Sequence, residues 1–163
     1  MKRLFTLLAV FSLVMVLCGC GEKEPAGSLI VEETGYVSVE GEKLESMKEC
    51  IRGYLEAVSE HDHTRITELT EESFLYNYDE TQFDEYCRYI DGYSLEAVDS
   101  GSISASDGSF RVPVSYSLNY YAPFTDYNGV SQDSGSYIYS ADFVLKETKD
   151  GFRIEDISDR PMG

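Results

Sequence analysis

Apolar residues recur at helical spacing from Glu42 onward, and charged residues occupy the opposite side. The apolar stripe of this first predicted helix consists of Leu44, Met47, Ile51, Tyr54, Leu55 and Val58. Asp62 is a favourable N-cap residue and predicts a short second helix, whose apolar side is made by Ile66 and Leu69. A third helix is predicted with Thr81 as its cap and Gly92 at its end. Its predicted buried face consists of Phe83, Tyr86, Cys87 and Ile90.

The apolar period changes to that of a strand after Gly92. A weak strand is predicted over 93–104, and Asp107-Gly108 is a hairpin signal. The next strand alternates strictly, with its apolar positions at Phe110, Val112, Val114, Tyr116, Leu118 and Tyr120. A second long strand is predicted at Tyr137–Glu147, and Asp150-Gly151 turns the chain into a closing strand. Helices followed by a meander of strands predict an α+β fold, with N-terminal helices packed on a curled antiparallel sheet.

Pro113 interrupts the alternating strand at a position where an amide donor would be needed. Proline has no N–H for a strand ladder, so it predicts either a sheet edge or a bulge. Because bulges bend strands, we expect the sheet to curl at Pro113.

The first 19 residues have the pattern of a bacterial lipoprotein signal peptide. Lys2 and Arg3 give a positive start, and the apolar run that follows, about 14 residues, is shorter than the roughly 20 residues of a spanning helix. The run ends in Leu17-Cys18-Gly19-Cys20, which resembles a lipobox. Gly19 supplies the small residue before the cleavage site, so Cys20 is the predicted lipidated residue and Cys18 leaves with the leader. The alternative is an ordinary secreted protein cleaved nearby.

These features divide the chain into three parts. Residues 1–19 form the signal peptide, and residues 20–41 form a lipidated N-terminus and flexible tether rich in glycine and charge. Residues 42–163 form the α+β domain. Two apolar stretches of the tether, 29–31 and 36–39, can add a short strand to the domain. The predicted location is the extracytoplasmic face of a bacterial membrane, held by fatty acyl (palmitate-type) chains.

The charge of the chain excludes one class of partner. The formal net charge is −17, and removal of residues 1–19, which contain Lys2, Arg3 and no acid, leaves −19. Such a chain repels phosphate backbones and anionic membrane surfaces, so we expect no nucleic-acid partner. Membrane association must then come from the lipid.

Two segments resemble the nuclear-transport-factor-2-like superfamily of α+β cones, over about residues 42–158. Residues 54–62 (YLEAVSEHD) are similar to the first helix of that family running into a capping Asp, and residues 150–157 (DGFRIEDI) are similar to its closing hairpin. A tryptophan is common at the position of Phe152, and a glycine is common at His61. The resemblance includes lumazine-binding-like lipoprotein domains. It implies an apolar cavity between helices and curled sheet, in a superfamily that contains isomerases, dehydratases and non-catalytic binding or assembly domains.

A pocket and one acid are the candidate functional features of the domain. The expected pocket lies between the first helix and the sheet, is lined by tyrosines with a polar tip, and is formed by Tyr54, Tyr86, Tyr116 and Tyr120. Asp142 lies among apolar neighbours on a long strand. It is either a buried acid facing the cavity, placed for proton transfer with Tyr54 or Tyr116, or a residue on the wet face of the strand.

The sequence predicts no metal site and no cofactor. His61 and His63 are two residues apart, which does not bring them to one helix face, and the chain has no other histidine. The oxygen-rich loop around Asp126 to Asp133 lacks the glycine and glutamate spacing of a calcium loop. Cys50 and Cys87 are expected on buried helical faces. A disulfide between them is chemically allowed in an exported protein, and two free core thiols are the alternative.

These observations favour a non-catalytic, membrane-anchored domain that binds a small apolar ligand or an envelope protein. The alternatives are a cavity enzyme of isomerase or dehydratase type that uses Asp142, and a structural subunit of an envelope complex with the sheet as its interface. Fold alone does not choose among them.

Overall fold

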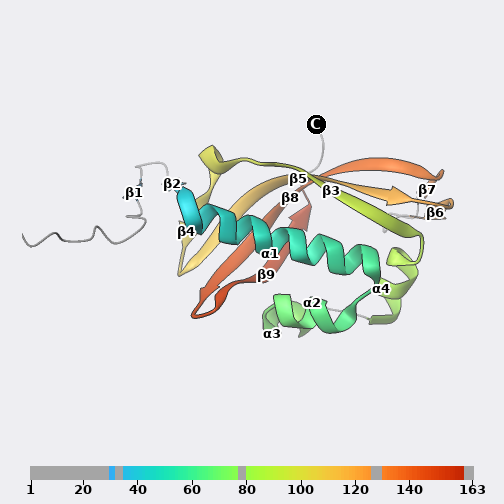
Figure 1. Ribbon diagram of the computed structural model, residues 1–163, viewed down its shortest axis with the longest axis horizontal. Helices are drawn as coiled ribbons and strands as arrows, with labels where there is room; N and C mark the ends of the chain where they lie inside the picture. Colours follow the sequence, from blue (N-terminus) through green and yellow to red (C-terminus); the bar gives the residue numbers. More distant parts are fainter. Residues whose placement is uncertain (1–29, 32–34, 77–79, 126–129, 160–163) are drawn as a thin grey trace, which may run out of the picture.

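The computed structural model describes residues 30–31, 35–76, 80–125 and 130–159, in which helices precede a long antiparallel sheet. The helices are α1 (Gly41–Glu60), α2 (His63–Leu69), α3 (Glu72–Tyr76) and α4 (Glu80–Cys87), with a 3-10 turn at Ser100–Ser102. The strands are β1 (Ile30–Val31), β2 (Val37–Ser38), β3 (Ile90–Val98), β4 (Ser104–Ser106), β5 (Ser109–Tyr120), β6 (Phe124–Thr125), β7 (Ser131–Gln132), β8 (Gly135–Thr148) and β9 (Gly151–Asp159). Figure 1 shows α1 lying along one face of the curled sheet. The α+β prediction is confirmed.

The main sheet has five strands, in the order β3-β5-β8-β9 with β4 also paired to β5. All neighbours are antiparallel, and β5 pairs with β8 without interruption from Ser109 to Tyr120. Asp107 and Gly108 both have positive φ (53° and 84°), as the tight turn between β4 and β5 requires. The predicted hairpin is therefore present, and the two long strands lie within two residues of their predicted bounds.

Pro113 lies in an interior strand, not in a bulge. The carbonyl of Pro113 accepts a hydrogen bond from the amide of Asp99 (3.0 Å), on the side where β3 ends and β4 has not yet begun. The N–H and C=O of one strand residue point to the same side, so the N–H that Pro113 lacks would face the gap between the end of β3 and the start of β4. The register irregularities lie elsewhere, in β3 and at the β8–β9 pairing, which corrects the expectation that Pro113 itself bulges the sheet.

The helices after α1 differ in part from the prediction. Asp62 caps α2 as expected, its carboxylate accepting from the Arg65 amide at 3.0 Å. The predicted third helix is instead shorter, because α4 ends at Cys87 and Ile90 begins β3 opposite Tyr120. Gly92 lies inside that strand, and α3 was not predicted. A short apolar run fits either structure, and here pairing with β5 decides for the strand.

Residues before 42 contribute to the packed domain. Strand β2 pairs with β1, and the amide of Val37 donates to the carbonyl of Ile103 (2.8 Å). Val37 and Val39 are 3% exposed and belong to the core. Within the segment predicted as a tether, Val37 and Val39 therefore form part of the packed domain, because burial of their apolar surface favours folding.

The core lies between α1 and the inner face of the sheet, which is the face turned toward α1. Helix α1 buries the stripe predicted for it, except that Leu44 is only partly buried. Gly53 faces α2, and a Cβ there would lie 3.4 Å from the Leu69 side chain. From the sheet, the fully buried partners are Val112, Ala141, Phe143, Leu145 and Ile154.

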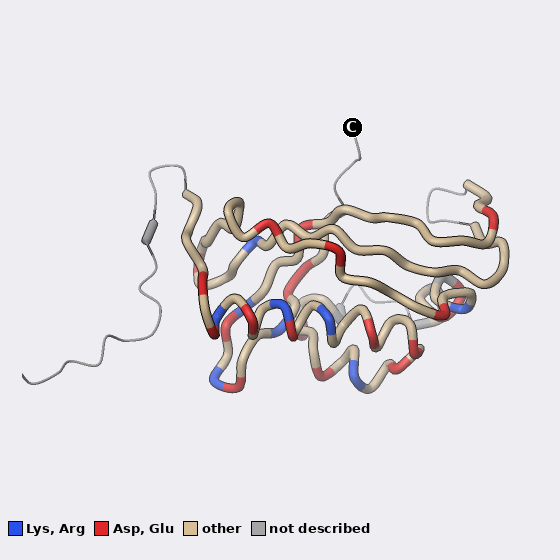
Figure 2. The backbone as a smooth tube through the Cα atoms, turned by 45° about the horizontal axis from the view of Figure 1, so that its top comes forward, with Lys and Arg blue, Asp and Glu red and all other residues tan. Residues whose placement is uncertain are grey.

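Charged residues avoid half of the main sheet. Figure 2 shows the adjoining halves of β5 and β8 without charge, whereas α1 and α2 carry alternating acids and bases. The segment 134–141 (SGSYIYSA) contains no charged residue in a chain of net charge −17. Within the described ranges, no helix has the length and apolar character needed to cross a membrane.

The end of α1 gives a prediction for stability. His61 has left-handed backbone angles (φ 58°, ψ 33°), and the amides of His61 and Asp62 bond to the carbonyls of Val58 and Ala57 in a Schellman motif. Glycine adopts this conformation at lower cost. We expect His61→Gly to raise the free energy of unfolding by about 0.5–1 kcal/mol, measured by urea denaturation. Ser59→Gly, two residues earlier inside the helix, should lower it by about the same amount; a His61→Gly protein no more stable than the parent would contradict the prediction.

Candidate functional site

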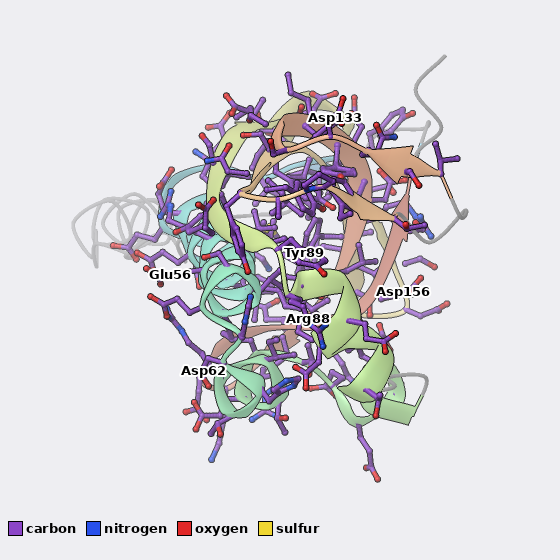
Figure 3. All side chains as sticks on the ribbon, turned by 90° about the vertical axis from the view of Figure 1, so that its right-hand side faces the viewer. Glu56, Asp62, Arg88, Tyr89, Asp133 and Asp156 are labelled. Carbon is purple, nitrogen blue, oxygen red and sulfur yellow. The ribbon has the colours of Figure 1, made fainter. Side chains whose placement is uncertain are left out.

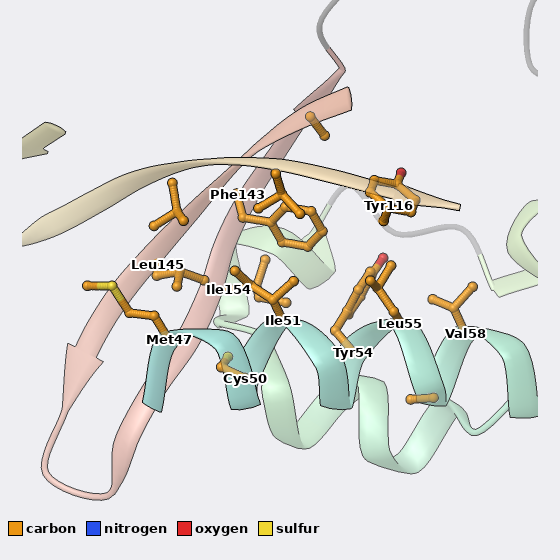
Figure 4. Close-up of a cluster of buried hydrophobic side chains, with 14 of the residues drawn as sticks. Met47, Cys50, Ile51, Tyr54, Leu55, Val58, Tyr116, Phe143, Leu145 and Ile154 are labelled. Atoms are coloured by element: carbon orange, nitrogen blue, oxygen red, sulfur yellow. The ribbon is translucent and has the colours of Figure 1, made fainter. Parts of the chain in front are cut away.

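Aromatic rings join α1 to the central strands. The Tyr54 ring on α1 meets the Phe143 ring on β8 edge-on (centroids 6.1 Å apart, planes at 77°), and Tyr116 on β5 meets Phe143 in the same way (6.1 Å, 79°). Tyr116 also stacks on Tyr139 at 5.5 Å. Edge-on and offset stacks of this kind stabilise beyond the area they bury. Figure 4 shows Tyr54, Tyr116 and Phe143 directed toward one another between helix and sheet.

A second aromatic group continues the layer toward the end of β5. Tyr120 stacks on Phe124 with centroids 3.6 Å apart, and the edge of Tyr137 contacts both rings. The hydroxyls of Tyr120 and Tyr139 lie 3.1 Å apart and connect the two groups. The structure thus places the two groups in one continuous layer, which we call the aromatic layer: Tyr54, Tyr116, Tyr120, Phe124, Tyr137, Tyr139 and Phe143.

Three of the four tyrosines predicted to line a pocket belong to this layer. Tyr54 and Tyr116 are 9% exposed and Tyr120 is 3% exposed, so each ring is a buried, packed side chain. Tyr86 lies in α4, and its side chain is outside the described part of the structure. The pocket itself stays a prediction.

Asp142 lies on the outer face of the sheet, which is the face turned away from α1. Neighbouring residues of a strand point to opposite faces, and Phe143 is directed at α1. The carboxylate of Asp142 contacts the Arg111 guanidinium at 3.3 Å, and the same nitrogen donates to the Ser158 hydroxyl. Asp142 is 8% exposed, so it is buried on the outer face of the sheet. It cannot exchange protons directly with Tyr54 or Tyr116, which lie across the sheet from it.

Side chains directed inward by the central strands are uncharged. From Phe110 to Tyr120 on β5 and from Tyr137 to Leu145 on β8, every inward position is apolar or tyrosine. Burial, together with the charge of Glu56, raises the pKa of the half-buried Tyr93 above its ordinary value, so its hydroxyl stays neutral. Figure 3 shows Glu56, Asp62, Asp133 and Asp156 at the periphery of the molecule. The aromatic layer therefore offers hydroxyl groups for hydrogen bonding and no charged acid or base.

A charged side chain packs on the aromatic rings at the starts of β5 and β9. The Lys43 ammonium lies 4.5 Å from the centre of the Phe110 ring and 5.9 Å from that of Phe152, and it pairs with Glu147 at 2.8 Å. Cation–π contacts of this kind contribute about 0.5–1 kcal/mol at exposed sites. Phe152, at the position where the resembling family often has tryptophan, packs edge-on against Phe110, with ring centroids 5.9 Å apart.

Cys50 and Cys87 are both buried free thiols in the structure. The Cys50 thiol donates to the carbonyl of Phe152 (3.3 Å). Burial raises the pKa of Cys50 to about 12, and burial together with the charge of Asp84 raises the pKa of Cys87. The expectation of burial is confirmed, and of the two redox alternatives the structure has the free thiols.

These thiols should be inert while the protein is folded. At pH 8 a thiol of pKa about 12 carries on the order of a thousandfold less thiolate than an ordinary cysteine. We expect Cys50 and Cys87 of the mature chain to react with a thiol reagent only after unfolding in guanidinium chloride, and reductant to leave the intact mass unchanged. Rapid reaction of either thiol in native buffer would contradict this prediction.

Several predicted features fall outside the described residues or have no counterpart within them. The signal peptide, Gly19 and Cys20 lie outside the described residues, and so do Asp126 and Asn128 of the oxygen-rich loop. His63, one of the two histidines considered for a metal, contacts Asp84 at 2.6 Å and joins the start of α2 to α4. Within the described ranges, no three His, Cys, Asp or Glu side chains are grouped to hold a metal ion.

Two features of the site were missed in the sequence. Phe124 belongs to none of the helices and strands predicted from the sequence, yet it forms the tightest ring contact of the aromatic layer. The other is the outer edge of β8 over residues 135–140, which lies beyond the last pairing with β9 that the structure describes, Asp159 with Ala141. The absence of charge over 134–141 was a signal that could have drawn attention to this edge.

The structure has the α+β architecture that the sequence predicted, with helices first and a curled antiparallel sheet after them. The resemblance to the nuclear-transport-factor-2-like superfamily stays a prediction from the sequence. No family model and no curated protein matches the chain. Among solved structures, it is similar to a chain described as a ketosteroid isomerase of Shewanella frigidimarina (TM-score 0.48, 11% identity, 71% of this chain and 94% of that chain). It is also similar to a variant of the protein Rd1NTF2_05 (0.49, 11%, 73% and 100%) and to the intermembrane-space region of the chloroplast protein ARC6 (0.46, 18%, 74% and 98%). These similarities concern the fold alone and carry no argument about function.

Proposed function

We propose that this chain is a lipid-anchored domain on the extracytoplasmic face of a bacterial membrane, where it binds another protein chain and performs no catalysis. One observation carries the proposal. The inward positions of the central strands hold only apolar and tyrosine side chains, and these rings pack against one another. The face used by a cavity enzyme is here part of the hydrophobic core, and binding falls to the exterior of the sheet.

The placement of Asp142 supports a non-catalytic role. General acid–base catalysis needs a group of suitable pKa within hydrogen-bond reach of the reacting atoms. Asp142 is turned to the outer face and engaged with Arg111, and tyrosine hydroxyls, with an ordinary pKa of about 10, are weak bases at neutral pH. The enzymatic alternative built on Asp142 and Tyr116 loses its geometric basis.

Binding of a small apolar ligand is the second candidate function. Tyr137 and Tyr139 are only partly buried, and the Tyr139 hydroxyl meets that of Tyr120 where the two groups of the aromatic layer join. Rings with polar tips beside apolar surface are typical of sites that hold small molecules.

Native mass spectrometry of the mature protein, purified in mild detergent, separates the two candidates. For a protein-binding domain we expect the mass of the acylated chain, or a multiple of it, with no additional small molecule. A bound compound that is lost in the Tyr139→Ala protein and retained in an Ile138→Ala control would overturn the proposal in favour of ligand binding. Ile138 is the matched control because it is the neighbouring residue on the opposite face and is 56% exposed.

A further inference from the structure

The outer edge of β8 has main-chain groups that no described residue satisfies. Because the carbonyl of Pro113 points toward β3, the neighbouring positions Val114, Tyr116 and Leu118 of β5 point toward β8. Their partners on β8 are odd-numbered, so the even-numbered residues direct their N–H and C=O groups away from β5. In the part of β8 that precedes Ala141, the residues whose N–H and C=O groups point away from β5 are Ser136, Ile138 and Ser140. Among the described residues, which end at Asp159, strand β9 covers this side as far as Ala141.

The other two edges of the main sheet are protected, whereas this one is not. Strand β3 has two register irregularities, and it carries Asp91 and Glu96. The edge of β9 is bonded by the segment before α3, where the amide of Glu71 donates to the Ile154 carbonyl (2.8 Å). The open stretch of β8 has no charge, proline or bulge, which are the devices that keep strand edges from pairing with other chains.

The sequence of this edge reads the same in both directions, which suits antiparallel pairing with a copy of itself. Residues 136–140 read Ser-Tyr-Ile-Tyr-Ser, a palindrome centred on Ile138. An antiparallel strand from a second copy, related by a two-fold axis through Ile138, would place Ser136 opposite Ser140 of the partner and Ile138 opposite itself. These are the residues whose main-chain groups point outward, so each pair can exchange two N–H···O=C bonds. Ile138 is 56% exposed, and the pairing would cover it.

We propose that the open edge of β8, residues 136–140, pairs with the same edge of a second copy, so that one sheet runs through a symmetric dimer. This names the partner of the protein-binding role proposed above and rests on that role. The net charge of −17 for the whole chain, or −19 without residues 1–19, favours this edge, because an uncharged edge adds no close like-charge contact to the repulsion between two acidic copies. A five-residue edge buries little area, so the dimer is weak in dilute solution and gains from confinement of both copies to one membrane.

Cysteine cross-linking in the full chain, produced with its own leader and oxidised in isolated membranes, tests the register. Directly bonded residues of an antiparallel pair have Cα atoms about 5.5 Å apart, within disulfide range. We expect Ile138→Cys to give at least about tenfold more disulfide dimer than the parent chain, whose Cys50 and Cys87 are buried. Ser136→Cys alone should stay monomeric, because its two copies lie about 13 Å apart along the strands. Ser136→Cys produced together with Ser140→Cys should form the dimer.

Two controls give the opposing outcomes. Tyr121→Cys, 59% exposed and outside β8, should form no more dimer than the parent chain. If Tyr121→Cys, or Ser136→Cys alone, cross-links as much as Ile138→Cys does, the disulfide arises from random collision and the proposal is overturned. Absence of the Ile138→Cys dimer would overturn it as well. When Ile138→Lys is added to both the Ser136→Cys chain and the Ser140→Cys chain, the disulfide dimer should disappear, because the lysine places a charge on the edge of β8. Failure here leaves the native mass experiment untouched, so the two proposals fail independently.

Discussion

Phe143→Ala should lower the free energy of unfolding by about 3–5 kcal/mol, enough to unfold a large fraction of a marginally stable domain. The ring is 1% exposed and lies at the centre of the aromatic layer, between Tyr54 of α1 and Tyr116 of β5. Its removal takes away buried apolar area and leaves a cavity that three separate elements line. Because the chain has no tryptophan, unfolding in urea is best followed by far-UV circular dichroism.

Ile138→Ala, five residues earlier on the same strand, is the matched control. Ile138 is on the outer face and 56% exposed, so its truncation should change the stability of the monomer, measured in dilute solution, by less than about 0.5 kcal/mol. A Phe143→Ala protein as stable as the Ile138→Ala protein would contradict the arrangement of the core and reopen the space beside Tyr116 for a ligand.

Strands β5 and β8 were predictable because their pattern is local. The inner face of each strand is the more buried one, with Pro113, Ser117 and Asp142 as buried residues of the outer face, so large apolar residues recur at every second position. The same alternation already set Asp142 on the face of Ile138 and Val144, away from Phe143. Its apolar neighbours suggested a cavity acid, but they lie on the other face of the strand.

The boundary between α4 and β3 was not predictable from local pattern. Cys87 and Ile90 are three residues apart, a spacing that suits one helical face, and both are buried. What decides their structure is the pairing of Ile90 with Tyr120, thirty positions along the chain. Tertiary pairing of this kind overrides a short local pattern.

The open edge of β8 depends on where β8 and β9 begin and end, which composition does not reveal. β8 begins at Gly135, whereas the described part of its partner β9 ends opposite Ala141, and an irregularity between Val144 and Leu145 shifts their pairing. The palindrome at 136–140 is visible in the sequence, but only the register of β8 with β9 shows that, among the described residues, no strand pairs with this edge. The core could thus be derived from residue pattern, and the proposed interaction edge required the register.

Cys20→Ala should abolish both acylation and membrane retention, the largest effect expected of any single substitution outside the packed domain. The expectation rests on the residue before the cleavage site, since Gly19 is small and Leu17, which precedes Cys18, is bulky. Each buried CH₂ of the lipid contributes roughly 0.8 kcal/mol, and two or more chains are needed for stable anchoring. An acidic chain has no electrostatic attraction to anionic lipid that could replace them.

Labelling of cells with an alkyne fatty acid, followed by separation of membranes from the soluble fraction, measures both effects at once. The parent chain should carry the label and sediment with membranes, whereas the Cys20→Ala chain should carry no label and fail to be retained. Cys18→Ala is the matched control, because it changes the neighbouring cysteine two residues earlier and should leave label and retention intact. Label that persists in the Cys20→Ala chain would show that Cys20 is not the lipidated residue. Loss of label in the Cys18→Ala chain would move the predicted lipidated position to Cys18. Retention without label would instead require an apolar leader that is never cleaved, since the acidic domain itself has no means of holding to a bilayer.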